Sequence, residues 1–359
     1  MPHDLTSKTA RCSTILTDAL PPHMIPRSLP AAPANVIDAD GQPRMGRYAG
    51  STGVIDWSTL AAPYARSSLW RRFHHKRWQY VALSTPQLLC GIAIVDVGWT
   101  NTAFAYVFDR QQGKQIAGFS QDGIPGLSAK VSDQPGGPSR FHCFGNRIDY
   151  QPPTDGGDGK YQLSLQCEQF ELEAEFDASQ AAPLLLAVGP IVHGSVHATQ
   201  KSPGMPLTGE VRVGDQRYAL EGGVASFDYS NGLLARNTEW RWASAHGLDI
   251  GFNLQTGYFG KQENVLWLDG QLYALGNVRF EYDLAAPLAP WHIYTDDGLL
   301  DLQFMPDGAR HENKNMLIAA TRYIQPIGSF SGWVKPERNA APRPVEHLVG
   351  VTEEHFSRW

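Results

Sequence analysis

The segment NVLWLDGQLYAL, residues 264–275, decides the fold class of this chain. Two apolar runs flank the dipeptide Asp269-Gly270. Asn, Asp and Gly are the residues that most readily adopt the positive φ angles of a two-residue hairpin turn. The segment GEVRVGDQRYAL, residues 209–220, repeats the pattern around Gly214-Asp215. Both segments therefore predict antiparallel β-hairpins.

Further turns extend this pattern. Gly276-Asn277 precedes VRFEYD, and Asp297-Gly298 joins WHIYT to LLDLQF. Upstream, residues 79–83, 88–96 and 102–109 are rich in β-branched and aromatic residues, as strands are. Hairpins at this spacing close naturally into a meander or barrel. Because no βαβ alternation is present, the chain is predicted to be all-β with few helices.

Two segments carry less regular patterns. The basic stretch YARSSLWRRFHHKRW, residues 64–78, predicts a helix or an irregular segment with a solvated face. Residues 161–176, YQLSLQCEQFELEAEF, alternate apolar and polar side chains with one slip near Glu168. This period of two predicts one half-buried strand with a register slip.

Composition bounds the domain organisation. A chain of 359 residues favours two domains, and 42% hydrophobic with 18% charged residues is typical of globular proteins. The proposed division is an arm over 1–36, a first β domain over 37–190 and a second over 191–359. The formal net charge of −6 argues against nucleic-acid or anionic-membrane binding. The oligomeric state stays open.

Location and redox state follow from what the sequence lacks. Residues 1–20 have no uninterrupted apolar core of a secretory signal, and no run has the length and apolarity to cross a bilayer. Cys12, Cys90, Cys143 and Cys167 are far apart and form no CxxC pair. We therefore expect four free thiols and a reducing, cytoplasmic location.

Common catalytic and cofactor motifs are also missing. Neither GxGxxG nor GxxxxGK[ST] occurs, and the elbow-like string GSFSG has Phe330 in place of the nucleophilic serine. His193 and His197 have helical metal-pair spacing, but four residues of extended chain span about 13 Å. No metal and no cofactor are therefore expected.

The densest group of candidate site residues lies in residues 224–270. Asp228 and Tyr229 precede Ser230-Asn231-Gly232, which resembles a turn. Asp228 is then either a turn cap that accepts backbone N–H groups or a carboxylic acid kept protonated by an apolar cavity. In the second case it can deliver a proton.

Two tryptophans follow on one strand face. Trp240 and Trp242 alternate with Glu239 and Arg241, so the tryptophans share a face. They either fill a barrel core or line a ligand chamber, where their rings would stabilise a cationic transition state.

Polar residues on the neighbouring strands form the third candidate group. Asn253, Gln255, Glu263 and Asn264 alternate with or follow apolar residues. In an ordinary barrel they would lie outside, or they would line a polar channel.

At these residues the chain resembles a known family. The strings that carry the resemblance are DVGWTNTAFAYVFD (96–109), HATQK (197–201), FDYSNG (227–232), TEWRWASA (238–245), NLQTG (253–257), ENVLWLDG (263–270), DLQFMP (301–306) and GVTEEHFSRW (350–359). Together they resemble the bacterial domain-of-unknown-function family 2804, over nearly all of the chain from about Ile37.

More distantly, the chain resembles the lipocalin-like superfamily of carotenoid 1,2-hydratases (hydroxyneurosporene synthases), AttH-like proteins and tocopherol cyclases. This resemblance implies two tandem calycin-type antiparallel β-barrels or half-barrels. It also implies an apolar, isoprenoid-like or polyketide-like substrate.

Two functions stay open. The first is a cofactor-free hydratase, lyase or isomerase with an apolar unsaturated ligand in a barrel cavity. Asp228 would protonate an alkene, and Trp240, Trp242 and Tyr229 would shelter the cation. Asn253 or Glu263 would position water.

The second function is a lipocalin-like carrier or sensor that uses the same cavity without chemistry. Lys201, Gln255 and Asn264 complete the ligand-binding candidates in either case. A buried acid in the cavity wall favours the enzyme, whereas an exposed Asp228 cap on an apolar chamber favours the carrier.

Overall fold

The computed structural model describes residues 28–154, 157–316 and 319–358, and nearly all of its regular structure is β. The predicted arm, residues 1–36, lies mostly outside these ranges. The first sheet comprises β1 (Gly46–Ala49), β2 (His75–Ser84), β3 (Leu88–Asp96), β4 (Asn101–Asp109), β5 (Lys114–Gly123), β6 (Ala129–Val131), β7 (Ser139–Cys143), β8 (Asn146–Gln151), β9 (Lys160–Gln166), β10 (Phe170–Asp177), β11 (Leu185–Pro190), β12 (Val196–Lys201), β13 (Met205–Val213), β14 (Gln216–Ala219) and β15 (Gly223–Leu233).

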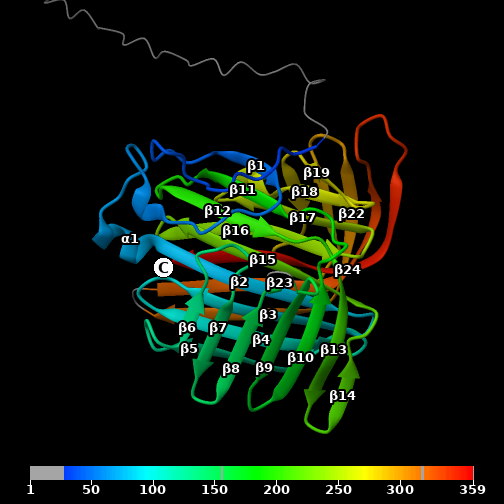
Figure 1. The fold of residues 1–359 in the computed structure, drawn as a ribbon. Helices are drawn as coiled ribbons and strands as arrows, with labels where there is room; N and C mark the ends of the chain where they lie inside the picture. The colour runs from blue at the N-terminus through cyan, green and yellow to red at the C-terminus, as the bar shows by residue number, and fades with distance from the viewer. Residues whose placement is uncertain (1–27, 155–156, 317–318, 359) are drawn as a thin grey trace, which may run out of the picture.

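The second sheet comprises β16 (Asn237–His246), β17 (Ile250–Gly257), β18 (Val265–Leu268), β19 (Gln271–Ala274), β20 (Val278–Glu281), β21 (Trp291–Thr295), β22 (Leu300–Met316), β23 (Ala319–Val334) and β24 (Arg343–Arg358). The described helices are α1 (Ser68–His74) and the 3-10 turns η1 (Trp57–Thr59) and η2 (Gly260–Glu263). The antiparallel strands form one nearly closed barrel and one half-barrel (Figure 1). The predicted all-β fold class is confirmed.

The predicted hairpin turns are mostly confirmed. Gly214-Asp215 joins β13 to β14, and Asp269-Gly270 joins β18 to β19 with φ angles of 49° and 76°. Gly276-Asn277, however, joins strands that do not pair, because β19 and β20 lie at opposite ends of the second sheet's strand order. There the chain crosses from one sheet edge to the other.

Two other local predictions are confirmed only in part. α1 ends at His74, and the rest of the predicted helix enters β2, which pairs with both β3 and β15. Residues 161–176 form the hairpin of β9 and β10, in which Leu165 pairs with Leu172. The pairing of β2 with strands on both sides overrides the local helix propensity of its first residues. The turn between β9 and β10 contains no Gly, Asn or Asp that would mark it in the sequence.

The two sheets separate in sequence between Leu233 and Asn237, where β15 ends and β16 begins. The predicted domain boundary after residue 190 falls between β11 and β12, which pair with each other in the first sheet. The division into residues 37–190 and 191–359 stays a prediction.

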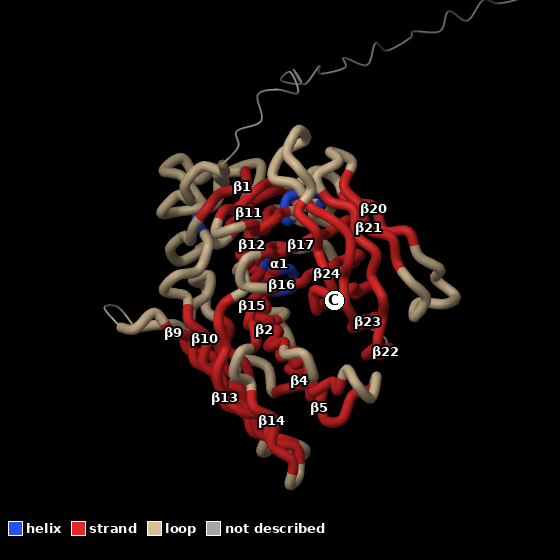
Figure 2. The backbone as a smooth tube through the Cα atoms, turned by 90° about the vertical axis from the view of Figure 1, so that its right-hand side faces the viewer, coloured by secondary structure: helices blue, strands red, loops and turns tan. Residues whose placement is uncertain are grey.

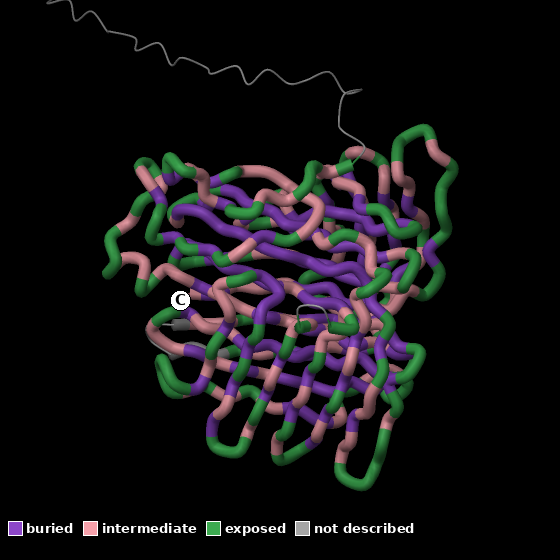
Figure 3. Tube along the Cα trace, in the orientation of Figure 1, coloured by how far each residue is buried: buried purple, intermediate pink, exposed green. Residues whose placement is uncertain are grey.

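Each sheet has its own apolar core, and further apolar clusters join the two. In β2, Val81 and Leu83 enter the first core, while Tyr80 packs on the other face of the strand. There it meets Trp242 and Ile327 from the second sheet. Figure 2 shows the strands of the two sheets, and Figure 3 shows that buried residues are concentrated in the strands while many loops are exposed.

Candidate functional site

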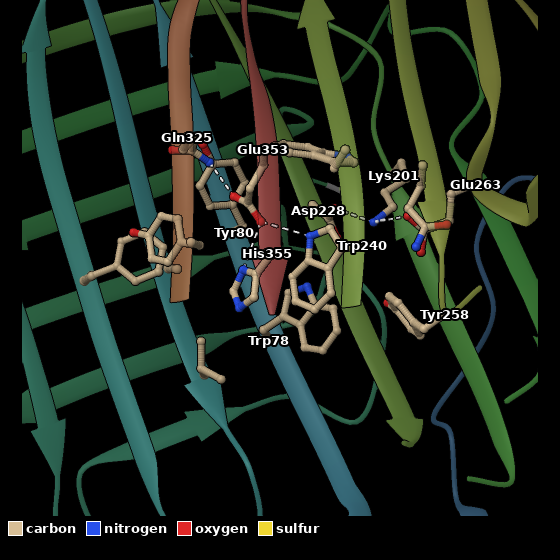
Figure 4. Close-up of a pocket in the computed structure, with 16 residues that line it drawn as sticks. Trp78, Tyr80, Lys201, Asp228, Trp240, Tyr258, Glu263, Gln325, Glu353 and His355 are labelled. Atoms are coloured by element: carbon tan, nitrogen blue, oxygen red, sulfur yellow. Dashed lines mark hydrogen bonds and ion pairs between the residues drawn. The ribbon is translucent and has the colours of Figure 1, made fainter. Parts of the chain in front are cut away.

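A cavity of about 130 Å³ lies between the outer faces of the two sheets (Figure 4). At about 10–15 Å³ for each water, it has room for about ten small heavy atoms. The first sheet contributes Trp78, Tyr80, Ala93, Val95, Phe104, Lys201 and Asp228 to its lining. The second sheet and its connections contribute Trp240, Trp242, Gln255, Tyr258, Glu263, Tyr323, Gln325, Glu353 and His355. The pocket is thus not the interior of one barrel, as the sequence predicts, because both sheets line it.

A buried cluster of three charges occupies one end of the pocket. Lys201 pairs with Asp228 across β12 and β15, so both side chains lie on the same face. Lys201 Nζ donates to Asp228 Oδ2 and lies 3.1 Å from Glu263 Oε2. Glu263 arrives from η2, at the edge of the second sheet. The charged atoms of one ammonium and two carboxylates are therefore withdrawn from water together.

The excess of carboxylates determines the protonation of this cluster. Burial raises the pKa of Asp228 to about 6; Lys201 opposes this shift and the charge of Glu263 adds to it. Burial also acts on Glu263, but Lys201 and His197 hold the pKa of that carboxyl below its ordinary value. Burial opposes the charge of Lys201, yet the two carboxylates raise its pKa. Asp228 is therefore the carboxyl that takes up a proton near neutral pH.

His197 and Tyr258 lie behind this cluster. His197 Nε2 is 3.8 Å from Glu263 Oε1 and 3.5 Å from the Tyr258 hydroxyl. Burial lowers the pKa of His197, so its imidazole is neutral. It therefore adds no second positive charge to the cluster.

A third carboxylate, Glu353, occupies the other end of the pocket. Trp240 Nε1 donates to its Oε1 at 2.9 Å, and Gln325 Nε2 donates to its Oε2 at 2.8 Å. His355 Nδ1 lies 3.1 Å from the same Oε1. Figure 4 shows Asp228 and Trp240 between this group and the Lys201–Glu263 end.

Aromatic rings form most of the remaining wall. Trp240 stacks on His355 with centroids 3.9 Å apart, and on Trp78 at 6.4 Å. Tyr80 meets Trp242 edge to face at 6.0 Å. Such faces attract positive charge through their quadrupole. The pocket thus combines an aromatic wall with carboxyl groups at both ends.

The structure brings six of the sequence candidates to the pocket: Lys201, Asp228, Trp240, Trp242, Gln255 and Glu263. The other three lie behind its walls. The Tyr229 side chain enters the first core and donates to the carbonyl of Ser132. Asn253 accepts from Trp242 Nε1, and Asn264 Oδ1 accepts from the backbone N–H of Gln255.

The predicted turn at Ser230–Gly232 is wrong, and with it the capping interpretation of Asp228. These residues continue β15, where Ser230 pairs with Trp78 of β2 and Thr199 of β12. A strand paired on both sides has no free backbone N–H for a cap. Asp228 Oδ2 accepts from Lys201 instead, and its Oδ1 is buried with no hydrogen-bond partner among the described residues.

The candidate polar residues are not on the outside, as an ordinary barrel would place them. Asn253, Gln255, Glu263 and Asn264 are at most 3% exposed. The first sheet covers this face of the second, so both faces of β17 are buried. Both amide atoms of Gln255 are without a partner in the described structure.

Sequence reasoning missed Glu353, His355, Gln325, Tyr258 and Trp78. Glu353 and His355 alternate on β24 within the string GVTEEHFSRW, which was used only for the family resemblance. A carboxylate and an imidazole two residues apart in a strand share a face. That spacing was a usable signal, whereas nothing local showed that Gln325 or Tyr258 meets the same pocket.

Three further findings concern the described residues outside the pocket as well as in it. No group of three or more His, Cys, Asp or Glu side chains in the described ranges is arranged to hold a metal ion. Within the same ranges, no helix has the length and apolarity to cross a membrane. Cys90, Cys143 and Cys167 are free thiols, and Cys12 lies outside the described residues.

Solved structures share this fold at low sequence identity. CghA with Sch210972 has a TM-score of 0.56 and 11% identity, covering 92% of this chain and 98% of that chain. Kievitone hydratase from Nectria haematococca has a TM-score of 0.54 and 10% identity, covering 90% and 98%. An AttH-like protein from Nitrosomonas europaea has a TM-score of 0.49 and 14% identity, covering 83% and 95%.

A search of curated protein sequences finds no match to this chain. The profile of the family described as Domain of unknown function (DUF2804) matches residues 29–359, nearly the whole chain. The match includes both sheets and every residue of the pocket. The chain therefore belongs to the DUF2804 family.

Proposed function

We propose that this protein is a hydratase-like enzyme that protonates a carbon–carbon double bond of an apolar unsaturated ligand held between its two sheets. The observation that carries the proposal is Asp228: a carboxyl group in the pocket wall, 14% exposed, with one oxygen held by Lys201 and the other unpaired. Burial raises its pKa to about 6.

Protonating an alkene requires an acid that keeps its proton near neutral pH and faces a poorly solvated site. Asp228 meets the second requirement, and its pKa of about 6 leaves half of the carboxyl protonated at pH 6 and a smaller protonated fraction at pH 7. Lys201 fixes the orientation of the carboxyl through Oδ2 and leaves Oδ1 to carry the proton. Lys201 and Glu263 pair with each other, so a neutral Asp228 leaves the cluster without net charge.

The pocket walls suit the cation that forms next. Protonation of one alkene carbon leaves its neighbour positive, and the faces of Trp240 and Trp242 supply negative quadrupole charge without reacting. Water then adds to the cation and loses a proton, which yields a tertiary or benzylic alcohol. The fold likeness to kievitone hydratase supports a hydratase on this scaffold.

A carrier of the same kind of ligand is the second candidate. The run of aromatic rings from Trp78 to Trp242 favours it, since such walls bind apolar molecules without chemistry. The two functions differ in one respect. Only the enzyme requires the proton of Asp228.

Water addition tests the proposal directly. The protein is incubated with prenyl-substituted phenols and short isoprenoid alkenes in H₂¹⁸O near pH 6, and mass spectrometry follows products that gain one labelled water. We expect Asp228→Asn to abolish the gain of labelled water, while binding of the same unsaturated compounds persists. Asp215→Asn, at the exposed tip of the β13–β14 hairpin, is the matched control and keeps full activity.

An Asp228→Asn variant as active as the wild type would refute the assignment of the acid. Binding of the same compounds, with no product from any of them in either direction of the reaction, would favour the carrier.

A further inference from the structure

Glu353 is the carboxylate in the pocket that the proposed function leaves without a role. Its side chain is 12% exposed and projects from β24 of the second sheet, whereas Asp228 projects from β15 of the first. Its negative charge is one of the causes that raise the pKa of Asp228, so the two groups act on each other across the pocket. Lys201, which pairs with Asp228 and Glu263, has no contact of hydrogen-bond length to Glu353 among the described interactions.

Neutral donors hold Glu353 in place. Trp240 Nε1 can only donate, and it meets Oε1 at 2.9 Å. The orientation of Gln325 is determined as well, because its Oε1 accepts from the Tyr106 hydroxyl at 2.7 Å. Its amide nitrogen is therefore the atom that meets Glu353 Oε2, at 2.8 Å. Both donors stabilise the carboxylate as an acceptor without neutralising it, and each oxygen retains acceptor capacity toward the pocket.

A chain of polar atoms leads away from Glu353. Glu353, His355 and Ser357 alternate on one face of β24. His355 Nδ1 lies 3.1 Å from Glu353 Oε1, and its Nε2 lies 2.7 Å from Ser357 Oγ. Ser357 Oγ in turn lies 3.1 Å from the hydroxyl of Thr321, which is partly exposed. The series connects the pocket to the end of β24 and the start of β23.

We propose that Glu353 is the general base of the site, which takes a proton from the attacking water while Asp228 gives one to the alkene. The inference rests on the proposed function. Asp228 loses its proton to one alkene carbon, and the water oxygen bonds to the other. The O–H bond of that water breaks toward Glu353. The proton leaves through His355 and Ser357, and solvent returns one to Asp228, so protons and charge balance over the cycle.

A reactive probe tests the pair without knowledge of the natural substrate. Styrene oxide is a small aromatic epoxide within the size of the cavity. An acid that protonates its oxygen breaks one C–O bond, and a carboxylate placed opposite then attacks the benzylic carbon and forms an ester. Wild-type protein is treated with a series of probe concentrations, digested, and mapped by mass spectrometry.

We expect one ester per chain, on Glu353. Asp228→Asn should slow its formation at least tenfold, because the epoxide loses its acid, and Glu353→Gln should abolish it. Glu354→Gln is the matched control: the same substitution on the next residue of β24, whose side chain meets Tyr282 on the other face, leaves the ester yield unchanged.

An ester on Asp228 or Glu263 in place of Glu353, or no ester on Glu353, overturns the inference. Because the decisive map uses wild-type protein, it does not depend on the folding of any variant. The two proposals also fail separately. Water addition with no ester on Glu353 removes only the base. An ester on Glu353 with no water addition removes the hydratase, and with it the base role that rests on it, and leaves only the opposed placement of the two carboxyl groups.

Discussion

Replacing Asp228 by Asn is expected to stabilise the protein at alkaline pH, although it removes the proposed catalytic acid. Asn has nearly the shape of a protonated Asp, so the packing at β15 is kept. What is lost is the cost of ionising a second carboxylate beside Glu263, where Lys201 supplies a single positive charge. In the unfolded chain both carboxylates ionise in water without that cost.

The magnitude follows from the pKa of Asp228, which is about 6 in the folded protein against an ordinary 3.8. Each unit of difference corresponds to 1.36 kcal/mol, so the cost approaches about 3 kcal/mol. Because the pKa is raised, the folded state binds more protons between pH 4 and 6, and stability falls as pH rises through that window. The cost is absent below pH 4, grows through the window and is complete above pH 6.

Urea and thermal unfolding of both proteins at pH 4 and pH 8 measure this effect. We expect equal stability at pH 4 and a gain of about 3 kcal/mol for Asp228→Asn at pH 8. Scaling of the unfolding entropy with chain length converts that gain to about 4 °C in Tm. A variant less stable than the wild type at pH 8 would refute the reasoning, because it would mean that the ionised carboxylate stabilises the fold.

Three further predictions concern the same region and the thiols. Lys201→Met leaves two buried carboxylates without a cation, so the free energy of unfolding should fall by about 3–5 kcal/mol at pH 8 and by less at pH 5. Urea unfolding measures both values, and equal losses at the two pH values would contradict this prediction. Replacing Trp240 and Trp242 together by Ala should abolish quenching of tryptophan emission by nitrobenzene, a small neutral quencher within the size of the cavity; quenching that survives would place the probe elsewhere. Thiol titration of denatured, unreduced protein should count four free thiols, with Cys90 unreactive before denaturation because burial raises its pKa to about 12; disulfides would exclude the reducing compartment.

Local turn chemistry was sufficient to predict the fold class. Asp269-Gly270 and Gly214-Asp215 mark their hairpins because both turns need positive φ, which few residues tolerate. The hairpin between β9 and β10 was missed because its turn residues, Glu168 and Gln169, carry no such preference. Strand pairing between distant segments, as between β2 and β15, leaves no local mark at all.

The site was predictable only in part. Trp240, Trp242, Asp228 and Glu263 were found because unusual residue types gather in one stretch of sequence. Their grouping around one pocket depends on the docking of two sheets, which no residue spacing describes. The same docking buries Asn253, which a single barrel would expose.

The position of the pocket between the sheets couples ligand binding to their association. Lys201 and Glu263 belong to different sheets, so their contact exists only while the sheets are docked. A ligand bound there contacts both sheets. Its binding free energy therefore adds to the free energy that keeps the two sheets docked. Asp228 lies on the first sheet and Glu353 on the second, so any parting of the sheets would move the proposed acid and base away from each other. Ligands that contact both sheets are therefore expected to raise the melting temperature, and a thermal-shift screen with this protein would detect them.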